Sequence, residues 1–194
     1  MLPLLISVAG FGGFGHFNLS LRFPQISELS NYLRDKGYGE LKGYFVSTGG
    51  SGYGVIEKVL IGGEGGSFIG ASVRSESLKR TARIVGYLLY SNKRFNFYGI
   101  LGIGGGSINI TLIEDYSGSF DSAFVNPPRT AKFSNGSYLI KASLQGDVSL
   151  YGLSLGLKVG YSHALGGGWN VVGGPRASAG GPFLNIIVGG GFLF

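Results

Sequence analysis

Long segments of this chain alternate between large apolar residues and small or polar ones. In GLSLGLKVGYS (152–162), one parity carries three leucines, a valine and a tyrosine, and the other carries glycines, serines and one lysine. The same period of two runs through 137–145 and 183–194. Successive side chains of a β-strand point to opposite faces, so each segment is predicted to be a strand with one apolar face.

Extending this pattern along the chain indicates an all-β fold. Eight strands are predicted, at 3–17, 41–54, 58–75, 78–91, 94–112, 135–146, 148–163 and 182–194. Several of them are longer than the ~5–6 residues that are usual in globular proteins.

A single helix is predicted at 24–37, in the first long connection. Pro24 suits the start of a helix, and Gly37 is a typical residue just beyond its end. The apolar face of this helix is formed by Ile26, Leu29 and Leu33. Because an isolated helix of this length is marginal in water, that face must be buried.

The connections between the predicted strands follow a pattern in length. Three long connections (18–40, 113–135, 164–181) alternate with short ones (55–57, 91–93, 146–147), and a short turn at 76–77 is the exception. Outer-membrane barrels have an even number of strands, with short turns at one end and longer loops at the other.

The whole-chain pattern resembles small eight-stranded bacterial outer-membrane β-barrel proteins, the OmpA/OmpX-like class, including uncharacterised glycine-rich barrels. The glycine-rich stretches LIGGEG (60–65) and ILGIGGGS (100–107) share in the resemblance, as does the alternating last strand. The resemblance implies one antiparallel up-and-down transmembrane β-barrel domain over 1–194. It also implies a bacterial outer-membrane location, with a signal peptide removed or absent, and a lipid bilayer as partner. Phe192 and Phe194 on the last strand would be the signal for the barrel-assembly machinery. We expect the helix at 24–37 to cap or plug the extracellular mouth of this barrel.

Composition excludes several other classes of protein. Charged residues make up 13% of the chain, and the net charge of +6 is scattered rather than gathered in a basic stripe, so no nucleic-acid partner is expected. The chain has no cysteine and no run of about 18 apolar residues, so neither disulfides nor a transmembrane helix are predicted.

Motifs that suggest catalysis fail on their context. Gly10, Gly12 and Gly15 have the spacing of a dinucleotide-binding turn, but a strand pattern follows where a helix is required. Ser154 stands in a G-x-S-x-G motif inside a strand, and no acid follows it in the sequence. The two histidines, His16 and His163, are expected at strand ends or in loops. No catalytic, cofactor-binding or metal-binding residue is predicted.

Parity assigns a set of residues to the interior of the barrel. Its glycines are Gly62, Gly66, Gly70, Gly99, Gly105, Gly152, Gly156, Gly160, Gly189 and Gly191. Its polar network is predicted to be Lys58, Glu64, Arg74, Lys141, Gln145, Lys158 and Asn185. Glycine lining is expected to leave room for water, a ligand or the helix. A buried carboxylate needs a partner, so Glu64 is expected to pair with Lys141, Lys158 or Arg83.

These features predict a non-enzymatic outer-membrane barrel with a structural or surface-interaction role, its lumen sealed by the helix or by side chains. One alternative is a narrow channel or carrier for small or apolar molecules, which would make a small apolar ligand a partner. The other is a soluble, lipocalin-like ligand-binding barrel. A lipocalin would place its apolar residues inside and its charges outside.

Overall fold

A computed structural model of the chain describes residues 11–38, 40–70, 76–92, 94–113 and 130–193. The elements are β1 (Phe11–Arg22), α1 (Ser27–Asp35), β2 (Phe45–Ile56), β3 (Val59–Gly70), β4 (Glu76–Ser91), β5 (Phe95–Ile113), β6 (Thr130–Leu150), β7 (Leu153–Trp169) and β8 (Gly181–Leu193). Each strand pairs antiparallel with its neighbours in sequence, and β8 pairs with β1 to close the barrel. The predicted fold, an eight-stranded up-and-down barrel with a short helix in the first long connection, is confirmed. The assignment of 1–194 to one domain stays a prediction.

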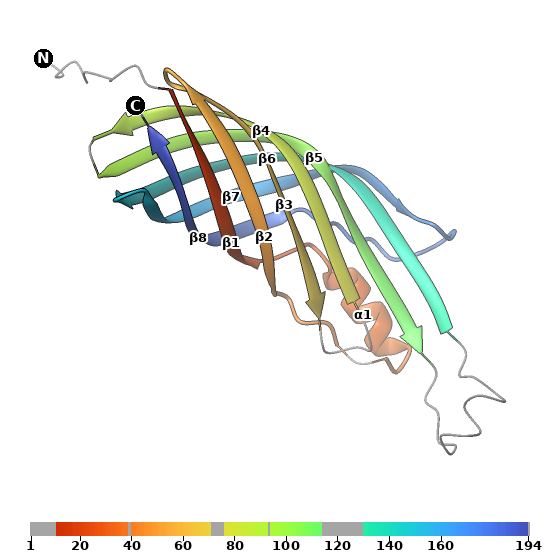
Figure 1. Ribbon diagram of the computed structural model, residues 1–194. Coiled ribbons are helices and arrows are strands. Elements are labelled where there is room, and N and C mark those ends of the chain that lie inside the picture. The colour runs from red at the N-terminus through yellow and green to blue at the C-terminus, as the bar shows by residue number, and fades with distance from the viewer. Residues whose placement is uncertain (1–10, 39, 71–75, 93, 114–129, 194) are drawn as a thin grey trace, which may run out of the picture.

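The barrel has two distinct ends (Figure 1). At the turn end, β1 begins, β8 ends, and short turns join β2 to β3, β4 to β5 and β6 to β7. At the opposite loop end lie α1 and the connection from β7 to β8. The helix therefore sits at the mouth with the longer connections, as the alternation of connection lengths predicts.

Several predicted boundaries are wrong. The turn expected at 146–147 is part of β6, and the chain turns at Tyr151 and Gly152, both of which have positive φ. Two consecutive residues with positive φ suit the right-handed twist of a hairpin, so the turn forms there. β4 already includes Glu76, which was expected in a turn. β1 reaches Arg22, five residues beyond its predicted end, while its predicted start lies outside the described residues.

Apolar side chains cover the outside of the barrel. On β7, Leu153, Leu155 and Leu157 are 70%, 61% and 55% exposed, whereas Ser154 and Lys158 are buried in the lumen. The inward side chains form three layers. An apolar cluster fills the turn end, a polar layer lies in the middle, and a second apolar cluster includes the helix at the loop end.

Helix α1 is fixed at both ends. Before it, the backbones of Gln25 and Ser178 form an isolated bridge, which attaches the start of the helix to the β7–β8 connection. After it, Gly37 adopts positive φ, and the backbone N–H of Tyr38 donates to the carbonyl of Leu33 at 2.9 Å. This is a common way for a helix to end, because it satisfies carbonyls of the last turn.

Glycine has a purpose besides the one predicted. A Cβ on Gly160 or Gly189 would collide with the backbone of the neighbouring strand, so these glycines also allow close strand approach. Strong coiling of a small barrel crowds its inward positions. Gly99 and Gly105 were predicted inward but share the outward parity of Leu101 and Ile103, and Gly152 lies in a turn.

Candidate functional site in the polar layer of the lumen

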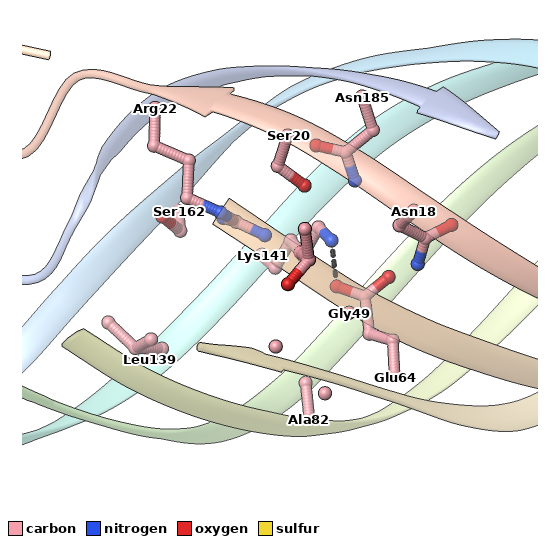
Figure 2. Close-up of a pocket in the computed structure, with 13 residues that line it drawn as sticks. Asn18, Ser20, Arg22, Gly49, Glu64, Ala82, Leu139, Lys141, Ser162 and Asn185 are labelled. Carbon is pink, nitrogen blue, oxygen red and sulfur yellow. Dashed lines mark hydrogen bonds and ion pairs between the residues drawn. The ribbon is translucent and has the colours of Figure 1, made fainter. Parts of the chain in front are cut away.

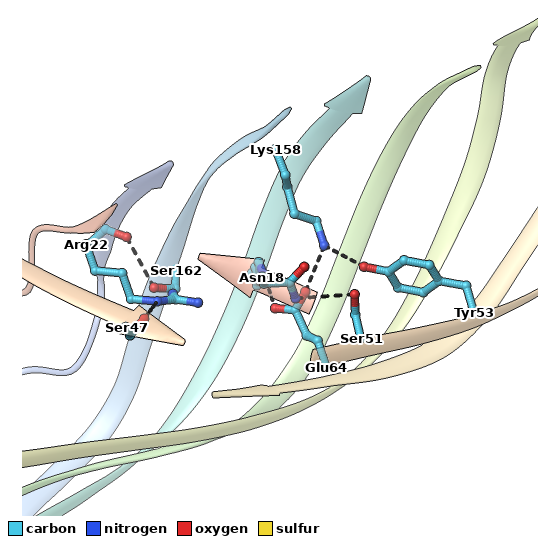
Figure 3. Close-up of polar contacts among 10 residues, drawn as sticks. Asn18, Arg22, Ser47, Ser51, Tyr53, Glu64, Lys158 and Ser162 are labelled. Carbon is cyan, nitrogen blue, oxygen red and sulfur yellow. Dashed lines mark hydrogen bonds and ion pairs between the residues drawn. The ribbon is translucent and has the colours of Figure 1, made fainter. Parts of the chain in front are cut away.

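Glu64 is the centre of the polar layer. Its two carboxylate oxygens pair with different lysines: Oε1 with Nζ of Lys141, and Oε2 with Nζ of Lys158 at 2.7 Å. Lys158 also donates to the hydroxyl of Tyr53 at 2.9 Å (Figure 3). The Lys158 side chain is fully buried, so its ammonium group depends on these two oxygens for its solvation.

Strand parity and glycine place these side chains. Glu64 occupies an inward position of β3 between Gly62 and Gly66, and Lys158 occupies one of β7 between Gly156 and Gly160. The inward neighbours of both charged residues on their own strands therefore lack side chains. Long side chains from opposite walls can then cross the lumen and meet.

Arg22 contributes a third cation at the loop-end side of this layer. Its Nε donates to Oγ of Ser47 at 3.3 Å. The guanidinium carbon lies 5.1 Å from the ring centre of Phe183, and Nζ of Lys141 lies 4.3 Å from the same ring. Figure 2 shows Arg22, Lys141 and Asn185 around one small pocket of the lumen. The sequence prediction missed Arg22 because it placed this residue in a connection.

A second carboxylate lies nearer the turn end. Asp147 is 2% exposed and accepts hydrogen bonds from the side-chain amides of Asn96 (3.1 Å) and Gln145 (3.3 Å). Gln145, predicted in the network, thus belongs to this group and not to the ion pairs of Glu64. Asp147 occupies an inward strand position because Gly146 and Asp147 continue β6, where a turn was expected.

His16 and Ser154 form a buried pair. The Nε2 atom of His16 lies 3.1 Å from Oγ of Ser154, and the imidazole is stacked on Phe14. His16 was expected at a strand end or in a loop, but it points into the lumen, whereas His163 is exposed on β7. In the described part of the chain, Nδ1 of His16 has no hydrogen-bond partner, so no carboxylate orients this imidazole as in a hydrolase triad.

The remaining residues of the predicted network lie in different parts of the chain. Asn185 is 1% exposed and lines the pocket beside Lys141. Lys58 is half-buried in the β2–β3 turn, one residue before β3 begins, so it lies at the turn end and not in the polar layer around Glu64. Arg83 is on the outward face of β4 and is exposed, so it does not pair with Glu64. Arg74 is outside the described residues.

The helix face predicted to be buried lies in the loop-end cluster. Ile26, Leu29 and Leu33 are 4%, 3% and 4% exposed. They pack with strand residues of the barrel mouth and with Ala179 of the β7–β8 connection. At the other end of the chain, Phe192 belongs to β8, while its side chain and Phe194 are not described, so the proposed assembly signal stays a prediction.

The described residues contain no group of three or more histidine, cysteine, aspartate or glutamate side chains arranged to hold a metal ion. No helix among them has the length and hydropathy needed to cross a membrane.

Comparison with known proteins identifies the fold. No protein-family model and no curated protein matches the sequence. The structure is similar to that of Ail, the attachment invasion locus protein of Yersinia pestis, solved in complex with the heparin analogue sucrose octasulfate. This match has a TM-score of 0.50 and 12% identity, and covers 96% of this chain and 100% of Ail. A second structure of Ail gives a TM-score of 0.43 and 14% identity, over 97% of this chain and 100% of that one. The fold is that of the small eight-stranded outer-membrane β-barrels.

Proposed function

We propose that this chain is a non-enzymatic outer-membrane protein with a sealed lumen and a structural or surface-contact role. The observation that carries this proposal is the distribution of polar and apolar side chains in the barrel. Charged and amide side chains are buried inside, while leucine, isoleucine and valine cover the outside. On β7, the outward residues from Leu153 to Val159 form an apolar band, with Tyr151 beyond one end and Tyr161 beyond the other. Such bands flanked by aromatic residues match the hydrocarbon region of an outer membrane.

The filled lumen argues against a channel. The cavity beside Glu64 measures about 30 Å³ and has apolar clusters on both sides along the barrel. The polarity likewise argues against the lipocalin alternative, whose interior would be apolar. The pairing of His16 with Ser154 does not support catalysis, because the described residues supply no third group to this pair.

The loop end supports a contact role. Tyr32 and Tyr38 on and after the helix are 47% and 44% exposed, and Val172 of the β7–β8 connection is fully exposed. Tyrosine is enriched at protein interfaces, because it combines a large apolar surface with a hydroxyl group. We infer that this end faces the exterior of the cell and makes contacts there.

The membrane assignment is tested on the outer face of β7. Replacing Leu155 by Arg should destabilise the protein in lipid vesicles by about 2–4 kcal/mol if this position lies near the bilayer midplane. Leu155→Val is the matched control and should cost little. Urea unfolding of the refolded protein, followed by heat-modifiable gel mobility, measures both. An arginine variant as stable as the valine variant would mean that Leu155 does not face lipid.

The contact role needs a separate experiment. Cells that display the intact chain are compared with cells that display a Tyr32→Ser, Val172→Ser variant, for attachment to plastic and to cell-coated surfaces. We expect weaker attachment by the variant at equal surface abundance. Equal attachment of the two kinds of cell would contradict the contact role, and only the structural role would remain.

One observation favours the carrier alternative in a limited form. An apolar cavity of about 220 Å³ lies between α1 and the β7–β8 connection, and Leu33, Phe133 and Trp169 are among its lining residues. A cavity of this kind suits a small apolar molecule. Trp169 is the only tryptophan of the chain, so its emission reports directly on the cavity. A saturable shift of that emission on adding toluene would support binding, and an unchanged spectrum would remove this function.

A further inference from the structure

Positive charge exceeds negative charge around Glu64. Three cationic side chains, those of Arg22, Lys141 and Lys158, are buried in this part of the lumen, and the carboxylate of Glu64 pairs with the two lysines. Within the described residues, Arg22 makes no ion pair. An uncompensated charge in a protein interior is costly, so this arrangement favours a further negative partner.

The other described acid of the lumen does not supply that partner. Asp147 is bonded to Asn96 and Gln145, on the turn-end side of the layer. Arg22 and Lys141 instead share the ring of Phe183, which holds two cations near each other without neutralising either. The excess positive charge is therefore concentrated at the loop-end side of Glu64.

A cavity of matching size adjoins these cations. It measures about 30 Å³, and Figure 2 shows Arg22, Lys141, Ser20 and Asn185 around it. A cavity holds a water molecule when it exceeds roughly 10–15 Å³. This one has room for a halide-sized ion but not for a sugar, a nucleotide or a lipid headgroup.

The cavity wall also carries an unsatisfied polar group. Asn185 is 1% exposed, and its Oδ1 has no hydrogen-bond partner in the part of the chain that the structure describes. A half-turn of this amide would present its N–H groups to the cavity instead. Buried side-chain polar atoms are normally paired, so an unpaired one beside a cavity points to a missing partner.

We propose that the polar layer binds one small monovalent anion, of the size of chloride, between Arg22 and Lys141. The anion accepts hydrogen bonds from the guanidinium and ammonium groups, and from the Asn185 amide in its turned orientation. It gives Arg22 a charged partner and lowers the repulsion between the two cations. This site is enclosed by the barrel and is independent of the contact role proposed for the loop end.

Chlorine NMR tests the site directly. Chloride is titrated into the folded protein in detergent and chloride-free buffer, and the broadening of the chloride line is measured. The wild-type chain should give saturable broadening that bromide reverses. Arg22→Gln should weaken binding about tenfold or more, because it removes a charged donor. Arg83→Gln removes an arginine from the outward face and should bind like the wild type.

A second variant keeps the test decisive if Arg22→Gln does not fold. Asn185→Asp places a fixed carboxylate next to the two cations, in place of the anion. The variant protein should therefore fold and bind no chloride, and its unfolding midpoint should not depend on chloride. The absence of saturable broadening in the wild type would overturn the proposal. Equal affinity in the wild type, Asn185→Asp and Arg83→Gln would also overturn it, because the bound chloride would then lie elsewhere.

Discussion

The two ends of the lumen are closed by different parts of the chain. At the turn end, inward side chains of β1 to β5 form an apolar cluster on their own: Phe14, Tyr53, Val55, Leu60, Ile84, Leu88, Tyr98 and Ile100. At the loop end, strand residues such as Phe45, Ile108 and Ile110 meet Ile26, Leu29 and Leu33 from outside the barrel wall. The strands complete the first cluster alone, whereas the second depends on the first long connection.

This difference shows that the lumen of a small barrel can be filled in different ways along its length. An eight-stranded barrel is just wide enough for side chains to fill, and large residues at inward positions do so at the turn end. In the middle, glycines flank Glu64 and Lys158, and ion pairs fill the space instead. At the loop end, the amphipathic helix supplies the apolar side chains that complete the cluster.

The largest effect is expected from the layer between the two clusters. Replacing Glu64 by Gln leaves Lys141 and Lys158 without their shared carboxylate. This change should destabilise the fold by about 3–5 kcal/mol, because the partner charges of a broken buried ion pair remain buried and unpaired. Urea unfolding in vesicles measures the change. Asp35→Asn, at an exposed helix position, is the control and should cost less than about 0.5 kcal/mol. An unfolding midpoint equal to that of the control would contradict the pairing.

A cavity in the turn-end cluster should cost somewhat less. Leu60 is 1% exposed, and its replacement by Ala should lower the free energy of unfolding by about 3–4 kcal/mol, through lost burial and the void that remains. Because strands alone build this cluster, the loss should appear in the global unfolding of the barrel. Val59→Ala, on the outward face next to Leu60, is the control, because it places alanine in the same strand without opening a cavity in the cluster. Equal costs at the two positions would mean that the turn end is not closely packed.

The loop-end cluster should give the smallest and most local effect. Leu33→Ala removes part of the buried helix face and should cost about 2–3 kcal/mol, at the low end for a buried leucine, because the helix can shift at the open mouth. We expect faster proteolysis within the α1 region while the strand barrel keeps its heat-modifiable mobility. Tyr32→Ala, on the exposed side of the same helix, should leave proteolysis unchanged. Loss of the whole barrel in Leu33→Ala would show that the two ends are not independent.

The sequence predicts the features that depend on period and on charge. Strict alternation defines the strands near the C-terminus, and the helical spacing of Ile26, Leu29 and Leu33 defines the single helix. Glu64 could be matched with lysines because few charged residues have inward parity. These features follow from the residues themselves, without knowledge of neighbouring strands.

Other features depend on information that local patterns lack. The alternation of large apolar and small polar residues cannot be followed through the glycine run that includes Gly105. The prediction therefore assigned the inward and outward faces of the strand the wrong way round there. Gly146 and Asp147 look like a turn, but the hairpin forms at Tyr151 and Gly152, which hid the buried carboxylate of Asp147. Arg22 was missed because its strand continues past the expected end, supported by pairing with β2 and β8.

Single-channel recording in planar bilayers tests the sealed lumen most directly. The intact protein is compared with a variant in which residues 24–37 are replaced by a glycine–serine linker of equal length, and heat-modifiable mobility confirms that both are folded. We expect no steady conductance from either protein, because the ion pairs of Glu64 and the turn-end cluster remain when the helix is removed. Steady current steps from the intact protein would contradict a sealed lumen. Steps from the linker variant alone would show that the helix is the only seal.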